Sequence, residues 1–454
     1  MNRPQKSGQR RSKSLSRSLE KSSEIPVTTG DMLEYRVARL FIHLGFYVRR
    51  TRELYTVGYL DQATDLDVFA IRYTEPFRRE VQICECKSGG EGPLDRVFWI
   101  AGVKKYINAT NATLVRKSTK WNIKNFATEA GVEILDLPRL EEMEKNLAIP
   151  PTQWLGASDG EFFSSHSTRW QSILNRDSVL KELHLTLAGE VRFHEPFSGI
   201  NFLLHHLRAL TRMIREGRAP SESLCRYLVT ESVVELAMFL MRVAEMCVSL
   251  SAKDQEGLIR KGLTYGNVDS KLTERIFRNA HRITGEMVKF YTGKSVQVDE
   301  SLFSIPEPPE LPQIQALVRL LVDRPALASS FVPITDLLVS ERYLKQRDRV
   351  DWLSNIFKYT DLKERVQLVN EYLRLLHSAD AVPDLLWPGK KSGLDSTEES
   401  RSRSSPVKNP EERRTQEEVS AGGKQGSLDD EPSTRKTGGV AAQNYAGPLF
   451  DKNE

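Results

Sequence analysis

Residues 65–87 read DLDVFAIRYTEPFRREVQICECK, and this stretch decides the expected fold of the N-terminal part of the chain. Residues 65–73 alternate and are rich in apolar side chains, and residues 80–87 are similar, so each segment is predicted to be a strand. Between them, Pro76 lies in a short polar segment that is typical of a turn. The stretch therefore predicts two consecutive strands joined by a turn.

The flanking segments carry the signals of further helices and strands. Apolar residues recur at helical spacing from Leu33 to Leu44, and Gly45 ends that run. A glycine-rich loop at 89–92 leads into Pro93, which suits the first position of a helix. We expect a strand at 46–54, a helix from 93 to about 108, a strand at 112–116, a helix at 121–130 and a strand at 132–135. This order, α-β-β-β-α-β-α-β, predicts a mixed α/β sandwich.

The rest of the chain divides by composition. The strand signal largely disappears after Pro138, residues 150–195 give no clear pattern, and helical periodicity dominates 197–377. Helices are expected near 197–216, 220–250, 270–291, 310–323, 333–345 and 361–377. The two ends are polar and charged, which is typical of disorder. We therefore expect a disordered basic leader at 1–24, an α/β domain at 25–140, an all-helical domain at 150–387 and a disordered tail at 388–454.

Charge and cysteine content bear on partners and compartment. The formal net charge is +4 over 454 residues, so a nucleic-acid partner would need a local basic patch. The four cysteines form no CxxC pair and residues 1–24 lack the apolar core of a secretory signal, so a cytoplasmic protein is expected. The most apolar long stretch, 228–250, contains Glu231, Glu235, Arg242 and Glu245, which favours a packed helix over a membrane span.

Charged side chains at the end of the predicted strand 80–87 form the candidate site. Because strand side chains alternate, Glu85 and Lys87 face the same way, and both faces of this strand are mostly apolar. Such charges are costly to desolvate without partners, and a divalent metal with a phosphate would be suitable partners. If the two strands pair, Asp67 comes near Glu85, and two carboxylates with water suit Mg²⁺ or Mn²⁺. Lys87 beside the metal would orient or help deprotonate a water and stabilise charge on phosphorus.

Each of these residues also has a structural alternative. Glu85 and Lys87 would form a solvated pair if their strand lay at the edge of a sheet. Asp65 and Asp67 would be turn residues before a strand, although Asp67 is preferred as a ligand because it lies deeper in the strand. Glu34 borders the apolar stripe of the first helix, where it either completes the metal shell or is an ordinary surface glutamate.

Glu34, Asp67 and the run Glu85-Cys86-Lys87 resemble the E…D…(D/E)xK signature of the PD-(D/E)xK nucleases, with Mrr-type restriction endonucleases as the nearest relatives. The resemblance covers roughly residues 30–140 and includes the expected order of helices and strands. Two features depart from the pattern: no proline precedes Asp65 or Asp67, and Glu-x-Lys stands where Mrr-type enzymes often have Gln-x-Lys. The resemblance implies a restriction-endonuclease-like fold and Mg²⁺-dependent hydrolysis of nucleic-acid phosphodiester bonds. It also implies Asp67 and Glu85 as metal ligands, with Lys87 and Glu34 as further catalytic residues.

The expected function is therefore that of a metal-dependent endonuclease, with DNA favoured as substrate and genome defence or repair as the setting. The alternative is a protein that binds nucleic acid, or acts as a scaffold, through a nuclease-like fold without cutting. Basic side chains surround the site in sequence and are candidates for a phosphate-binding surface: Arg49, Arg50, Arg52, Lys104, Lys105, Arg116, Lys117, Lys120 and Lys124.

Two further segments suggest protein partners. Residues 228–250 are apolar around much of a helical circumference, which suits self-association into a homo-oligomer, and an internal core helix is the alternative. Residues 443–450 read QNYAGPLF and loosely resemble peptides that bind the bacterial sliding clamp. A chance apolar end to a polar tail is the alternative there.

Overall fold

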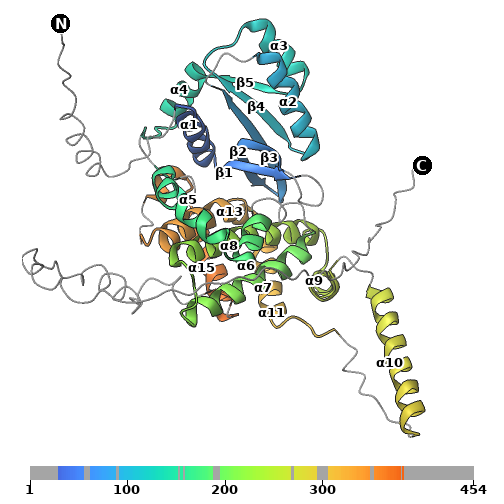
Figure 1. Ribbon diagram of the computed structural model, residues 1–454. Helices are drawn as coiled ribbons and strands as arrows, with labels where there is room; N and C mark the ends of the chain where they lie inside the picture. Colours follow the sequence, from blue (N-terminus) through green and yellow to red (C-terminus); the bar gives the residue numbers. More distant parts are fainter. Residues whose placement is uncertain are drawn as a thin grey trace, which may run out of the picture. The chain divides into compact units, whose positions relative to one another are not determined.

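The computed structural model describes residues 29–55, 62–87, 92–151, 154–156, 159–187, 195–266, 270–293, 305–347, 352–379 and 381–382. They form a five-stranded mixed sheet with flanking helices, followed by a mostly helical region (Figure 1). The expected leader at 1–24 and tail at 388–454, with its 443–450 segment, lie outside the described residues. No helix in the described part of the chain is long and apolar enough to cross a membrane.

The five strands lie in the sheet in the order of the chain. They are β1 (Tyr47–Tyr55), β2 (Gln62–Thr74), β3 (Arg78–Lys87), β4 (Asn111–Arg116) and β5 (Glu133–Asp136). β1, β2 and β3 pair antiparallel, whereas β3, β4 and β5 pair parallel. Parallel neighbours need a crossover, which helices α2 (Pro93–Tyr106) and α3 (Trp121–Glu129) supply. The predicted order of helices and strands in this part of the chain is confirmed.

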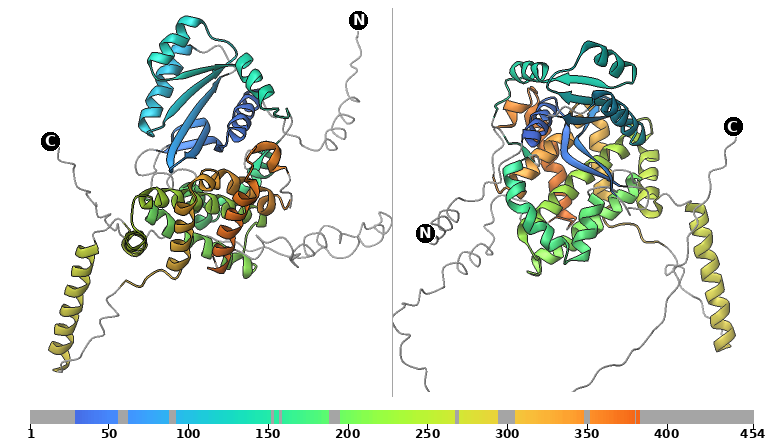
Figure 2. Two further views of the ribbon diagram at one scale, coloured as in Figure 1. Left: turned by 180° about the vertical axis from the view of Figure 1, so that it is seen from behind. Right: turned by 45° about the horizontal axis from the view of Figure 1, so that its top comes forward.

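Helices cover both faces of the sheet. α1 (Thr29–His43) and α4 (Leu137–Asn146) lie on one side, and α2 and α3 lie on the other (Figures 1 and 2). Residues 81–86 of β3 are consequently buried on both faces of the strand. β3 is the central strand, so the alternative that placed Glu85 and Lys87 in a solvated edge strand is wrong.

Gly45 makes the turn from α1 into β1, as the sequence predicts. Its φ of +84° lies in the left-handed region that favours glycine, and its amide donates to the Ile42 carbonyl at 3.0 Å. A Cβ at this position would also lie 3.3 Å from the Tyr359 hydroxyl of the helical region. The glycine therefore ends the helix and allows a close approach to the next part of the fold.

The helical region begins where sequence periodicity gave no clear pattern. α5 (Gly160–Leu174) and α6 (Ser178–Leu185) occupy much of residues 150–195. Each starts at an aspartate whose side chain accepts from helix amides: Asp159 from Phe162 N, and Asp177 from Val179 N and Leu180 N. These capping residues were the signal in the sequence that periodicity alone missed.

The later part of the chain contains a helix at each of the six places that the sequence predicts: α7 (Pro196–Arg215), α8 (Glu222–Cys247), α10 (Ser270–Thr292), α11 (Leu311–Asp323), α13 (Phe331–Val339) and α15 (Leu362–Ser378). Three further helices were not predicted: α9 (Ala252–Tyr265), α12 (Pro325–Ala328) and α14 (Leu353–Ile356). A π-helical turn, Ser340–Leu344, continues α13. The region 197–377 is thus helical, as predicted.

α8 is the core helix of this region, because it packs against α7, α11 and α13 and most of its side chains are buried. Its apolar circumference therefore serves internal packing, which is the alternative given above to a self-association surface. Exposed apolar side chains lie instead on α10, where Ile276, Met287 and Phe290 are 56%, 53% and 82% exposed. Self-association itself stays a prediction, without α8 as its surface.

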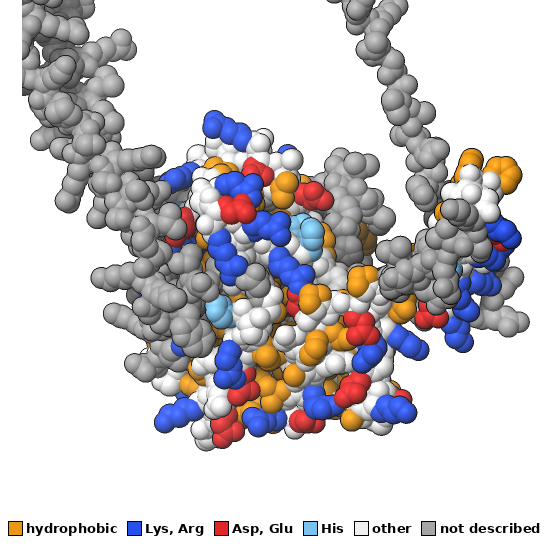
Figure 3. Space-filling model, turned by 90° about the horizontal axis from the view of Figure 1, so that it is seen from below, with side chains coloured by type: hydrophobic (Ala, Val, Ile, Leu, Met, Phe, Trp, Pro, Cys, Tyr) orange, Lys and Arg blue, Asp and Glu red, His pale blue; other side chains and the backbone are white. Residues whose placement is uncertain are grey.

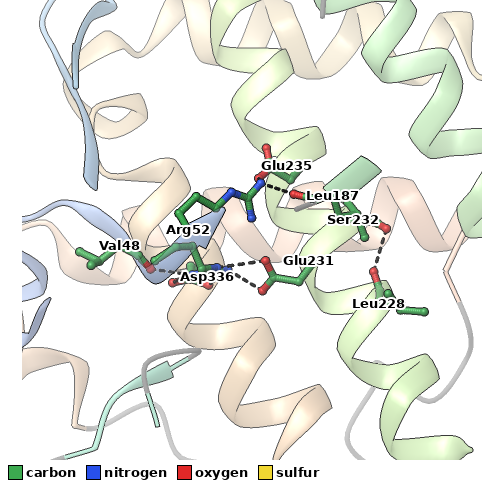
Figure 4. Close-up of polar contacts among 9 residues, drawn as sticks. Val48, Arg52, Leu187, Leu228, Glu231, Ser232, Glu235 and Asp336 are labelled. Carbon is green, nitrogen blue, oxygen red and sulfur yellow. Dashed lines mark hydrogen bonds and ion pairs between the residues drawn. The ribbon is translucent and has the colours of Figure 1, made fainter. Parts of the chain in front are cut away.

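Arg49 joins the sheet to the helical region. Its guanidinium lies between Glu231 of α8 and Asp336 of α13, with Nη2 2.8 Å from an oxygen of each carboxylate. Figure 4 labels these two carboxylates together with Val48 and Arg52 of β1. Nε and Nη1 make second bonds of 3.0 Å to the same two partners. All three side chains are buried. Burial alone would lower the pKa of Arg49, but the charges of Asp336 and Glu231 raise it, so this arginine stays charged.

We expect Arg49→Met to destabilise the fold strongly. The exchange keeps an unbranched apolar chain but leaves Glu231 and Asp336 buried with their shared cation removed, which typically costs about 3–5 kcal/mol. Urea unfolding followed by circular dichroism measures the change. Arg78→Met, at an exposed position of β3, is the matched control and should change stability little. A loss at Arg49 no larger than that of the control would contradict this role.

Candidate active site

Asp67, Glu85 and Lys87 come together in the structure, as the sequence predicts. The pairing of Val68 with Cys84 continues by one residue to place Asp67 across from Glu85. Lys87 Nζ lies 2.9 Å from Glu85 Oε1 and 3.9 Å from Asp67 Oδ2. The Asp67 carboxylate is also held by the backbone amide of Cys86, which donates to Asp67 Oδ2 at 2.6 Å. Two carboxylates and one ammonium thus converge between two neighbouring strands.

The site faces the same side of the sheet as Arg49. Phe69 of β2 is the register partner of both Arg49 in β1 and Ile83 in β3, so these three side chains point to one face. Asp67 and Glu85 are each two residues from that row and therefore share its face. Because Arg49 reaches α8 and α13 on this face, the helical region packs on the same face as the carboxylates.

Burial and mutual repulsion act on the two carboxylates. Glu85 is only 3% exposed, and burial followed by the charge of Asp67 raises its pKa, while Lys87 and Arg96 oppose the rise. Burial also raises the pKa of Asp67, against the donation from the Cys86 amide and the charge of Lys87. Both carboxylates are therefore harder to ionise than exposed ones, and perturbed pKa values of this kind are common at functional sites.

Lys87 is held in its charged form. Burial would lower its pKa, but the bond to Glu85 and the charges of Asp67 and Glu85 outweigh burial and raise the pKa above its ordinary value. A protonated ammonium cannot accept a proton from water. Of the roles expected for Lys87, orienting a water and stabilising negative charge fit the structure better than deprotonation.

Arg96 belongs to the site and was not recognised from the sequence. It lies in the first turn of α2, and its Nη1 is 3.5 Å from Glu85 Oε1. The sequence predicts a helix that begins at Pro93, so a basic residue in its first turn was the available signal. Arg96 adds a second positive charge beside Glu85, and this charge also acts on Asp67.

Glu34 is engaged by a different partner. Its Oε2 accepts from Arg50 Nη2 at 2.9 Å, and no contact with Asp67, Glu85 or Lys87 is recorded among the described residues. The charge of Asp67 nevertheless contributes to the raised pKa of Glu34, after burial as the main cause, so the two carboxylates are near neighbours. Glu34 is therefore at the margin of the site. The other aspartate considered, Asp65, is exposed, which supports the preference for Asp67.

The arginines proposed for phosphate binding are mostly occupied, and that prediction is wrong for β1. Arg49 is buried between two carboxylates and Arg50 binds Glu34, while Arg52 is buried and donates to the Leu187 carbonyl. Of the lysines, Lys104 donates to the Gly131 carbonyl at 2.9 Å and Lys124 binds Asp136 at 2.5 Å. The exposed candidates that remain are Lys105, Lys117 and Lys120.

No single-sign surface is visible on the face that Figure 3 shows, where side chains of both charges are intermixed with apolar ones. Any electrostatic attraction for phosphate on that face is correspondingly weak.

The residues present fit a magnesium-type ion bound together with a substrate. The described residues contain no group of three or more Asp, Glu, His and Cys side chains arranged to hold a metal by themselves. Mg²⁺, however, is commonly bound by one or two carboxylates, several waters and a substrate phosphate. Asp67 and Glu85 supply that number of carboxylates, with oxygen donors that Mg²⁺ and Mn²⁺ prefer.

Comparison with known proteins gave no match to a family model, a curated protein or a solved structure. The PD-(D/E)xK resemblance therefore rests on the residues and on the order of the elements.

Arg96→Gln is expected to move the pH dependence of metal binding upwards. Arg96 lowers the pKa of Glu85, so its loss lets burial and Asp67 raise that pKa further. Protons then compete with metal up to a higher pH, and the midpoint of Mn²⁺ affinity against pH shifts up. Above this midpoint the variant should bind at least as tightly, because a competing cation has gone. Calorimetric titration across the acidic to neutral range measures both effects.

The matched control is Lys124→Gln, which removes a cation that pairs with Asp136 of β5 instead of Glu85. It should leave the midpoint unchanged. An unchanged or lower midpoint in Arg96→Gln would show that Arg96 does not act on the metal-binding carboxylate.

Proposed function

We propose that this protein is a Mg²⁺- or Mn²⁺-dependent nuclease that hydrolyses phosphodiester bonds in nucleic acid, with DNA as the favoured substrate. The observation that carries the proposal is the convergence of Asp67 and Glu85 from neighbouring strands, with Lys87 Nζ 2.9 Å and 3.9 Å from their oxygens. The mixed sheet with helices on both faces, in the predicted element order, supports a restriction-endonuclease-like fold.

Each residue has a distinct task in this proposal. Asp67 and Glu85 bind the metal, which supplies Lewis-acid activation of the phosphate and of a water nucleophile. Lys87, held as an ammonium, stabilises negative charge that develops on the phosphate oxygens and orients the water. Arg96 is a positioning residue, since its contact is with Glu85. Glu34 holds Arg50 and supports the margin of the site.

The electrostatics favour a site over a structural ion pair. Arg72 and Glu80 provide a comparison on the same hairpin, with one cation and one carboxylate 2.5 Å apart and partly exposed. At the candidate site, by contrast, two largely buried carboxylates lie close together. Burial raises the pKa of both, and the charge of Asp67 raises the pKa of Glu85 further. Burial of two carboxylates costs stability, and a divalent cation bound together with a phosphate would offset that cost.

One observation favours the binding-module alternative. Lys87 and Arg96 already place two positive charges beside the two carboxylates, so the site is near neutral without a metal. In a protein that binds nucleic acid without cutting, these four groups would simply hold the ends of β2 and β3 together. Direct assays of metal binding and of cleavage separate the two functions.

The three site residues should fail in distinguishable ways. Asp67→Ala and Glu85→Ala each remove a metal ligand, so both metal binding and cleavage are lost. Lys87→Ala leaves both carboxylates, so Mn²⁺ still binds while the rate falls by about 100-fold or more. Cleavage is measured on linear and supercoiled DNA, single-stranded DNA and RNA, and metal affinity is measured by calorimetry.

Glu80→Ala is the matched control on β3, because it removes a carboxylate that pairs with Arg72 outside the site. It should retain cleavage and metal binding. Equal cleavage by wild type and Glu85→Ala would refute this active site. A wild type that binds these substrates with metal present but cuts none of them would favour the binding-module function.

A further inference from the structure

A cavity of about 200 Å³ lies at the β1 edge of the sheet, between α1, α5 and α8. Its walls include three aromatic rings: Tyr35 of α1, Phe163 of α5 and Tyr227 of α8. The rings are held by their neighbours, since Phe163 makes an edge-on contact with Tyr227, with 5.7 Å between the ring centres. Tyr35 is equally fixed, because its hydroxyl fills the space where a Cβ at Gly160 would lie. The walls are therefore preformed by packing.

The cavity adjoins the candidate active site. Thr51, one of its lining residues, lies between Arg50, which pairs with Val68, and Arg52, which pairs with Leu66. This register places Thr51 beside Asp67 on the neighbouring strand. Paired strands lie roughly 4.8 Å apart, so one strand spacing separates the backbone of Asp67 from that of Thr51 in the cavity lining. Thr51 is also exposed, which opens this side of the cavity to solvent.

Arg50 also lines the cavity. Its guanidinium carbon lies 3.6 Å from the centre of the Tyr35 ring, and its Nη2 binds Glu34. The cavity therefore combines aromatic side chains with a positively charged group held in a fixed position.

The size of the cavity restricts what can enter. Sites for larger ligands usually have about 300–1,000 Å³, whereas an engineered apolar cavity of roughly 150 Å³ accepts one benzene ring. About 200 Å³ therefore suits a single planar ring system and excludes a peptide or a whole dinucleotide. Nucleobases are planar, carry acceptor atoms at their edges and stack on aromatic side chains.

We propose that this cavity receives one nucleobase of the substrate, extruded beside the phosphate that occupies the Asp67–Glu85 site. The inference rests on the proposed function for the presence of a nucleic-acid strand. The base packs against the aromatic walls near the Arg50 guanidinium, while the strand crosses the sheet edge at Thr51. Extrusion of a base costs least in single-stranded, damaged or mismatched substrates, so those substrates are bound in preference to intact duplex.

Photo-crosslinking of the full-length wild type tests the proposal without any cleavage step. The probe is a single-stranded oligonucleotide in which every thymine is replaced by 5-iodouracil, irradiated in EDTA so that it stays intact. Mass spectrometry then locates the labelled residues. Labels on Tyr35, Phe163 or Tyr227 support the proposal. Labels confined to other residues, such as Phe98 or Trp121, overturn it. That result does not bear on the nuclease proposal, which the metal-dependent cleavage assay tests separately.

A free nucleotide is the other source of the same chemistry, and 5-iodo-deoxyuridine monophosphate is the probe for it. If the mononucleotide labels the three aromatic residues as efficiently as the oligonucleotide does, the cavity takes a free nucleotide and the extruded-base proposal is overturned. Weak labelling by the mononucleotide, beside strong labelling by the oligonucleotide, supports an extruded base.

Phe163→Leu provides a second, quantitative test. It keeps an apolar side chain but removes one stacking face, and we expect the affinity for single-stranded oligonucleotide to fall by roughly 5-fold or more. Phe290→Leu, the same exchange at an 82% exposed ring of α10, is the matched control and should leave affinity unchanged. An unchanged affinity in folded Phe163→Leu would contradict stacking on this wall.

Discussion

The double ion pair of Arg49 is the interaction on which the relation between the sheet and the helical region depends. β1 is an edge strand, and a single buried guanidinium ties it to both α8 and α13. Two buried carboxylates share this one guanidinium, and all four nitrogen–oxygen contacts are 3.0 Å or shorter, which is the close geometry that a buried ion pair needs. The position of β1, and of everything built against it, follows from this contact.

Thr51 explains how one strand makes two such contacts with one helix. Arg49 and Arg52 are three residues apart and would face opposite sides of a regular strand. Both nevertheless reach α8, where Arg49 binds Glu231 and Arg52 lies 4.0 Å from Glu235, one helical turn further on. Thr51 has a φ of +47°, which is rare for a β-branched residue and typically costs about 1–3 kcal/mol. The pairing of Arg50 with Val68 and of Arg52 with Leu66 keeps the register of β1 and β2 through Thr51. The left-handed residue therefore changes the backbone locally without inserting a residue, and the ion pairs on both sides hold it in place.

The sequence was a good guide wherever the deciding pattern was local. Glu85 and Lys87 share a face because they are two residues apart, and Asp67 joins them because the two strands are consecutive and form a hairpin. It was a poor guide wherever the partner lay far along the chain. Nothing near Arg49 signals that its carboxylates come from 182 and 287 residues away. Its apparent availability for phosphate was therefore an error, since a contact between distant elements leaves no periodicity in either segment.

The helical region thus has a place in the proposed chemistry although it carries no recognisable nucleic-acid motif. α5 and α8 provide Phe163 and Tyr227, so two of the three aromatic walls beside the candidate site come from the helical region. Glu231 both lines that cavity and binds Arg49, which makes the same side chain a structural anchor and a boundary of the space. On the proposed function, metal and phosphate would be positioned by β2 and β3, whereas the fit of the adjacent base would be set by the helices. Catalysis and substrate selection would then be divided between the sheet and the helical region, and the ion pairs of β1 would hold these two parts together.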